Sequence, residues 1–279
     1  MSAPALSPLS RRIPWPVLFP AAVLAVLLLA ALAPQVLSTV DPQAMDFRQA
    51  LRPPAPGHPF GTDQLGRDVY ARTVHAARVS LAVGVGATAI GFLVGSVLGL
   101  LAAVLSRVVD AVLMRVVDIL LAFPGLLLAL VCIAVLGPGP VNSAVAIGVA
   151  SVPQYARLVR AQAQVLRGSG FVEAARTLGQ GRMTVALRHI LPNALAPLTV
   201  LATLGVGTAI IAGAGLSFIG LGTAPPTPEW GAMLAEGRNL LGRAWWVVVF
   251  PGLCVTAAAI CVTVLGRHWQ AALEGRGRA

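Results

Sequence analysis

The chain has 279 residues, of which 57% are hydrophobic and only 11% are charged, whereas an ordinary soluble domain carries about 25% charged residues. This composition predicts a polytopic membrane protein, and the fold class that we expect is all-α. The net charge of +10 does not indicate a nucleic-acid partner, because the arginines are scattered through connecting segments without interleaved aromatic residues that could stack on bases.

The chain contains no lysine, which excludes a Walker A phosphate loop and a Schiff-base enzyme. If ATP drives this protein, another subunit binds it, so we expect no cofactor in this chain. The three cysteines fall in apolar segments and indicate packing rather than disulfides. The four histidines have no cysteine or near carboxylate at ligand spacing. We therefore expect that the chain has no metal site and no catalytic residue, and that it is not an enzyme.

Six apolar segments are long enough to cross a bilayer, whose core needs about twenty apolar residues per helix. The first follows Arg11 and Arg12 and has some features of a signal peptide, but its length and the lack of a clear cleavage site favour a retained anchor. The predicted spans are Val17–Leu37, Val79–Leu105, Ile119–Leu136, Val141–Val152 with a possible extension to Leu158, Asn193–Ile219 and Trp245–Leu265.

The arginine distribution predicts the orientation. With the N-terminus inside, cytoplasmic segments carry thirteen arginines against four acids, and external segments carry seven against six. This inside excess follows the positive-inside pattern and places both termini in the cytoplasm. The expected division is a tail (1–16), an anchor helix with an external segment (17–78), a transmembrane core (79–265) with a cytoplasmic loop (157–192), and a second tail (266–279).

Glycines and charges inside the spans favour packing over transport chemistry. Gly91, Gly95 and Gly99 lie four residues apart and leave one helix face without bulk, which favours close helix packing over a pore-lining or gating role. No span has a charged residue near its middle, which argues against a proton-coupled carrier. The same packing interpretation, with mobility as an alternative, applies to the fifth-span glycines Gly205, Gly207, Gly213 and Gly215.

The short inner connection between the second and third spans contains two acids. Asp110 and Asp118 accompany Arg107 and Arg115 there. This pattern predicts interfacial ion pairs rather than a proton relay.

An external motif precedes the second span. It combines acids, a hydroxyl and glycines, but it lacks the Asp spacing and the terminal Glu of a calcium loop. It predicts a turn with local salt bridges that leads into an amphipathic helix, Val69–Arg78, and that supports or gates the outer face. The residues of this motif are Gly61, Thr62, Asp63, Gly66, Arg67 and Asp68.

A polar segment on the cytoplasmic side predicts a helical elbow. Phe171–Leu178 is expected to be a short helix with Glu173 in its first turn, where a carboxylate suits the positive end of the helix dipole. Ala174 and Ala175 leave a low-relief face on this helix. Gly179 permits a turn that a Cβ would resist.

A second short helix, about Arg182–Ile190, is expected to end where Pro192 starts the next span. A small flat surface framed by Arg176 and Arg182 suits insertion of a helix into a groove on another protein. The alternative is an ordinary interfacial hairpin in which Glu173 only caps its helix.

A second external loop follows the fifth span. Its glycines and its Pro225–Pro228 run predict a stiff, non-helical excursion, and Glu229 beside Trp230 offers a charge and an aromatic anchor. The loop would receive an external protein or plug the outer mouth of the pathway, and simple rigidity is an equal alternative. The residues assigned to it are Gly220, Gly222, Pro226, Pro228, Trp230 and Gly231.

Taken in this order, the three motifs resemble the permease subunit of the dipeptide and oligopeptide group of binding-protein-dependent ABC importers, in the form with one anchor helix before its core. The resemblance runs from about residue 15 to about residue 265. It implies a type I importer-like fold with six transmembrane helices, in the inner membrane of a bacterium.

The resemblance also implies partners, namely a paralogous permease, two ABC ATPase subunits that bind and hydrolyse ATP, an extracytoplasmic substrate-binding protein and a peptide substrate. Similar permeases move nickel chelates, glutathione or other small solutes, so the cargo stays open. The family uses the Glu-Ala-Ala elbow as its coupling helix, which assigns ATPase coupling to Glu173, Ala174, Ala175, Gly179, Ile190, Leu191 and Pro192.

The chain departs from the family pattern in two places. Ala76 stands where relatives often have glycine, and the tail at 266–269 lacks the acids that are common after the last span, which puts a tail contact in doubt. A stand-alone channel or secondary carrier is the rival from another class. The lack of membrane-buried acids argues against that rival.

Overall fold

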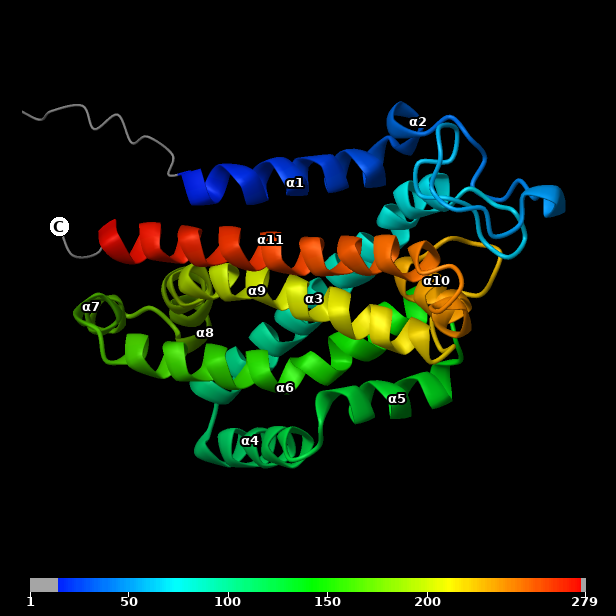
Figure 1. Cartoon of the computed structure of the whole chain (residues 1–279). Helices are drawn as coiled ribbons and strands as arrows, with labels where there is room; N and C mark the ends of the chain where they lie inside the picture. Colours follow the sequence, from blue (N-terminus) through cyan, green and yellow to red (C-terminus); the bar gives the residue numbers. More distant parts are fainter. Residues whose placement is uncertain (1–14, 277–279) are drawn as a thin grey trace, which may run out of the picture.

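The structure is a computed structural model that describes residues 15–276, and this part of the chain contains helices and no β-strand. The all-α prediction is confirmed. Five long helices form a bundle that α3 crosses obliquely (Figure 1): α1 (Trp15–Leu32), α3 (Val69–Val104), α6 (Pro140–Arg167), α9 (Leu191–Phe218) and α11 (Trp246–Arg276). The shorter helices are α2 (Pro34–Leu37), α4 (Arg107–Leu121), α5 (Gly125–Leu136), α7 (Gly170–Thr177), α8 (Arg182–Val185) and α10 (Trp230–Gly237), with 3₁₀ turns at Phe47–Gln49 and Arg238–Leu240.

Different elements gather at the two ends of the bundle (Figure 1). The elbow end holds α7, α8, the start of α1 and the end of α11, whereas the loop end holds α2, segment 38–68 and α10. Both described ends of the chain therefore lie at the elbow end. Which side of the membrane each end faces stays a prediction.

The number of membrane crossings is not decided by helix length and composition. Within the described residues, α3, Leu198–Phe218 of α9 and Trp246–Ala272 of α11 are each long and apolar enough to cross a membrane. Helices α4 and α5 qualify together but are bent by 96°, and Val17–Leu32 is a shorter apolar helix. Six spans stay a prediction, since α6 carries three arginines in its second half.

The helices in the first half of the core differ from the predicted spans in their bounds. The amphipathic helix expected at Val69–Arg78 is the start of α3 and is continuous with the second span. The third span does not begin at Ile119, because α4 ends at Leu121 and α5 starts only after Pro124. A proline disfavours helical backbone in the residue before it, which explains this break.

The terminal spans also differ from their predicted bounds. Helix α1 ends at Leu32, and Pro34 opens the separate helix α2. Helix α11 continues past residue 265, the predicted end of the sixth span, so 266–276 is helical. Residues 1–14 and 277–279 of the two predicted tails lie outside the described residues.

Glycines let α3 pack directly on α6, as the sequence predicted. A Cβ at Gly95 would lie 2.6 Å from the Tyr155 Cβ and 2.8 Å from the Val152 carbonyl oxygen. A Cβ at Gly99 would lie 2.4 Å from the carbonyl oxygen of Ala156. Small residues at such positions allow two helix backbones to approach closely.

The glycines of α9 also face neighbouring helices. A Cβ at Gly207 would lie 3.0 Å from the Ala259 carbonyl oxygen of α11, and one at Gly213 would lie 3.0 Å from Val83 of α3. Gly205 faces the hydroxyl of Tyr155, at 2.1 Å from the position a Cβ would take. Gly215 has open space around it, so packing explains three of these four glycines.

Candidate functional site

The elbow consists of α7, the turn after it and α8. Val172 and Ala175 on the inner face of α7 are buried in an apolar cluster that includes Val185 and Ile190. Glu173 and Ala174 point away from this cluster and are exposed. The predicted helix is confirmed within one residue at each end, and its two faces separate a packed side from a free side.

Gly179 closes α7 with a backbone conformation that favours glycine. Its φ is +79°, and nothing lies within 4 Å of the position a Cβ would take. The Gly179 N–H donates to the Arg176 carbonyl at 2.9 Å, and the Gln180 N–H donates to the Ala175 carbonyl at 3.1 Å. This pair of hydrogen bonds is a Schellman motif. The glycine is therefore required by the turn, not by crowding.

The second elbow helix does not end before Pro192, contrary to the prediction. Helix α8 passes through a π-helical turn, Ala186–Ile190, directly into α9. The Leu191 N–H donates to the Ala186 carbonyl across this widened turn. The wider turn makes room for Pro192, whose ring would clash with the carbonyl four residues earlier in a regular helix. Ile190 is buried, Leu191 is half-buried and Pro192 is exposed.

Sequence reasoning missed the exposed apolar residues of the elbow. Leu178 is 81% exposed, and Phe171, Met183 and Leu187 are also exposed. Exposed apolar residues that gather on one patch mark an interaction surface. The turn at Gly179 brings α7 and α8, which carry or adjoin these residues, into contact.

The elbow also borders a basic hollow of about 350 Å³. Arg167, Arg176 and Arg182 line it, together with apolar residues of α3, α8 and the π turn. None of these three arginines forms an ion pair with another described residue. Arg167 donates to the Ala103 carbonyl, so the free positive charge of the hollow comes from Arg176 and Arg182.

The first external motif is the centre of a buried charge network at the loop end. Asp63 accepts from the Arg67 Nε at 2.6 Å, which confirms the predicted local salt bridge, and from Arg72 of α3 at 2.5 Å. Both arginines also contact Glu236 of α10, at 2.7 and 3.0 Å. The side chains of Asp63, Arg67 and Arg72 are at most 3% exposed. The network therefore joins three segments instead of one turn.

The rest of this motif fixes the start of α3. Asp68 accepts from the Ala71 N–H at 2.7 Å as a helix cap and pairs with His58 at 2.7 Å. Thr62 is fully buried and accepts from the Arg52 N–H. Gly66 has a φ of +74°, and a Cβ there would lie 1.8 Å from the Asp46 carbonyl oxygen. A Cβ at Gly61 would lie 2.6 Å from the carbonyl oxygen of Arg52.

The second external loop turns its charge and its aromatic residue inward. Trp230 is fully buried and donates from its Nε1 to the Thr73 carbonyl at 2.9 Å. Glu229 caps α10 and accepts from Ser80 at 3.1 Å. The expectation that these two side chains offer a charge and an aromatic anchor to a partner is corrected, since they anchor the loop to α3. Gly231 packs against Ala214 of α9.

The remaining assigned residues of this loop form its turns. Gly220 has a φ of +86°, and a Cβ at Gly222 would lie 1.7 Å from the Ser217 hydroxyl oxygen. Pro226 and Pro228 lie between this turn and α10 without helical structure, as predicted.

The two acids of the inner connection form ion pairs, but with other partners than expected. Asp110 pairs with Arg160 of α6 at 2.5 Å, and Asp118 pairs with Arg157 of α6. The hydrogen bond from Arg160 lowers the pKa of Asp110, although partial burial opposes this shift. These pairs hold α4 against α6, a contact between residues far apart in the sequence.

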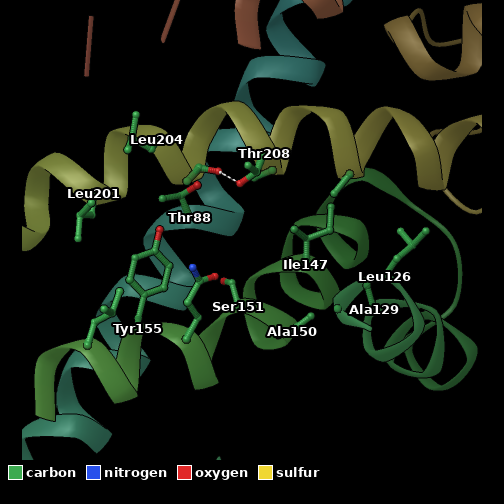
Figure 2. Close-up of a pocket in the computed structure, with 16 residues that line it drawn as sticks. Thr88, Leu126, Ala129, Ile147, Ala150, Ser151, Tyr155, Leu201, Leu204 and Thr208 are labelled. Carbon is green, nitrogen blue, oxygen red and sulfur yellow. Dashed lines mark hydrogen bonds between the residues drawn. The ribbon is translucent and has the colours of Figure 1, made fainter. Parts of the chain in front are cut away.

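A pocket of about 430 Å³ opens between α3, α5, α6 and α9 (Figure 2). Tyr155 and Ser151 of α6, Thr88 of α3 and Thr208 of α9 line it along with apolar side chains. Figure 2 shows the Tyr155 hydroxyl pointing from α6 toward Thr88 and α9. Sequence reasoning did not identify this pocket, because its lining residues look like ordinary membrane-helix residues.

Known proteins resemble the chain over most of its length. Residues 95–277 match the family described as binding-protein-dependent transport system inner membrane component. A di/tripeptide transport system permease of Pseudomonas aeruginosa is 42% identical over 77% of this chain and 71% of its own length. A probable D,D-dipeptide transport system permease of Escherichia coli is 41% identical over 88% of this chain and 83% of its own length.

A glutathione transport system permease of Pectobacterium atrosepticum is 38% identical over 91% of this chain and 85% of its own length. Among solved structures, the MetNI methionine ABC transporter in an inward-facing conformation matches with a TM-score of 0.59 at 20% identity. That match covers 72% of this chain and 95% of the other. At this identity the structural match shows a shared fold.

Proposed function

Because the chain belongs to the family of inner membrane components of binding-protein-dependent transport systems, we propose that it forms part of the translocation pathway of an ABC importer for peptides. Two permease relatives are named for peptides and one for glutathione, itself a tripeptide derivative. Glutathione, a nickel chelate or another small solute is the alternative cargo for the same machinery.

The observation that carries the coupling role is the free face of the elbow. Glu173 and Ala174 lie exposed between Phe171 and Leu178 in the sequence, and the elbow borders a hollow lined by three arginines. A helix that presents apolar anchors can enter a groove on a partner. The unpaired arginines suit acidic side chains on that partner. We assign this partner surface to an ATPase subunit.

The elbow transmits motion because its inner face is packed into the bundle. Val172, Ala175 and Ile190 share one apolar cluster with Leu100 and Ala103 of α3. Closure of the ATPases would pull the elbow and swing the helices from an inward-facing to an outward-facing arrangement, and hydrolysis would reset them. Changing the ratio of outward-facing to inward-facing molecules from about 1:99 to about 99:1 takes roughly 5.5 kcal/mol.

The complete transporter contains, in this proposal, a paralogous permease, two ATPases and an extracytoplasmic binding protein. ATP is bound and hydrolysed by the ATPases, and this chain is not itself an enzyme. It lies in the inner membrane of a bacterium with both termini in the cytoplasm. The buried network of Asp63, Arg72 and Glu236 supports a rigid loop end, on which the binding protein docks.

Uptake by reconstituted vesicles tests this function. Vesicles that contain the complete assembly, internal ATP and the binding protein should accumulate a labelled neutral dipeptide. Vesicles that contain this chain alone should not accumulate it, with or without an ion gradient. Gradient-driven uptake by the chain alone, indifferent to ATP, would support a secondary carrier and overturn the proposal.

A further inference from the structure

The pocket between α3, α5, α6 and α9 has a lining without charge. Its sixteen lining residues include no Asp, Glu, Arg, Lys or His. The volume of about 430 Å³ falls in the range of small-molecule sites, roughly 300–1,000 Å³. Thr88 and Thr208 place the pocket near the middle of α3 and α9. The pocket is therefore an uncharged chamber far from both ends of the bundle.

Most polar groups of this lining are already bonded to the protein. The hydroxyls of Thr88, Ser151 and Thr208 donate to carbonyls of their own helices at 2.7–2.9 Å. The side chains of Tyr155 and Gln154 have no hydrogen bond to any described residue. Tyr155 is only 6% exposed as a whole residue, and it lines the pocket together with Gln154. These two groups are available for a ligand.

Tyr155 is held in its orientation. Its ring packs edge-to-face on Phe92 with 5.7 Å between centroids. Its hydroxyl occupies the space that a Cβ at Gly205 would fill. The hydroxyl is thus fixed at the pocket wall (Figure 2), and the Gln154 amide lines the same pocket from the preceding position of α6.

We propose that this pocket is a solute subsite that takes an uncharged side chain and the adjoining amide group of a peptide. The inference rests on the proposed function. A glutamine amide both donates and accepts hydrogen bonds, as a peptide group does, so the two are complementary. An acyl chain of a lipid offers no such partner. A charged side chain would be desolvated there without an opposite charge, so it is disfavoured.

An amide-to-ester comparison tests the subsite. The complete assembly is reconstituted in vesicles, and maximal uptake rates are measured for alanyl-leucine and for its analogue in which an ester replaces the amide. Gln154→Leu should lower the rate for the dipeptide about threefold to tenfold and the rate for the ester less, so that the amide-to-ester ratio falls. Tyr155→Phe should lower both rates about threefold to tenfold, since the carbonyl is present in both.

The ratio compares two solutes in one preparation, so the amount of folded assembly cancels. Gln162→Leu is the matched control, because Gln162 is exposed on α6 outside the pocket, and it should keep wild-type rates. Unchanged rates in both pocket variants, or an equal loss in the control, would overturn the subsite while the proposed function stands. A wild-type assembly that takes up no peptide would instead overturn the proposed function and this inference with it.

Discussion

Arg72→Met should lower the stability of the loop end by about 3–5 kcal/mol, because it leaves buried carboxylates without enough positive charge. Arg72 is 2% exposed and contacts both Asp63 and Glu236. Its removal leaves one arginine for two acids. The melting temperature followed by tryptophan fluorescence should fall on the order of 10 °C, since the buried Trp230 and Trp246 report on this end.

Two further variants separate charge imbalance from loss of packing. Arg78→Met on the same helix removes an exposed arginine and should leave the melting temperature nearly unchanged. Adding Glu236→Gln to Arg72→Met leaves one positive charge, on Arg67, and one negative charge, on Asp63, and should recover part of the lost stability. If Arg72→Met alone is as stable as wild type, the network does not hold the loop end together.

Ala174→Asp should reduce peptide uptake by the complete assembly at least about tenfold, equivalent to about 1.4 kcal/mol of lost coupling. Ala174 is exposed on the free face of α7, so the carboxylate costs little in the chain alone but is desolvated in a docked groove. Uptake and binding-protein-stimulated ATP hydrolysis in vesicles measure the effect. Ser106→Asp adds the same charge at a helix cap of α4 and should not change uptake, since aspartate also caps helices.

Variants of Gly179 in the turn after α7 also test the coupling role of the elbow. A leucine with φ near +79° is strained by about 1–2 kcal/mol, so Gly179→Leu should also lower uptake. Gly179→Asn should retain more activity, because asparagine tolerates this conformation. Normal uptake with Ala174→Asp and Gly179→Leu would contradict the coupling assignment.

Local sequence rules predicted the local structure well. The helix at 171–178 was predicted within one residue at each end because its signals, Glu173 in the first turn and Gly179 after the last, lie close together in the sequence. The pairing of Asp63 with Arg67 follows from their spacing of four. The three motifs also carried the family resemblance, which the comparisons confirm.

Contacts between distant segments could not be predicted in the same way. Arg72 pairs with Glu236, which lies 164 residues later in the chain. Asp110 pairs with Arg160 of α6 and not with Arg107 or Arg115, which are near it in the sequence. Nothing in the spacing of these residues encodes the packing of α3 on α10 or of α4 on α6. The role of Tyr155 could not be predicted either, because Gly205 and Phe92, which hold its side chain at the pocket wall, lie far from it in the sequence.

Photo-crosslinking at the elbow tests the central claim most directly. A photoreactive amino acid replaces Leu178, which is 81% exposed at the elbow, and in a control assembly it replaces Val135, which is 83% exposed on α5. In an assembly that hydrolyses ATP, the probe at position 178 should form an adduct with an ATPase subunit, in a yield that changes with nucleotide, and the probe at 135 should not. If position 178 gives no ATPase adduct in such an assembly, the elbow is not the joint between this chain and the ATPase.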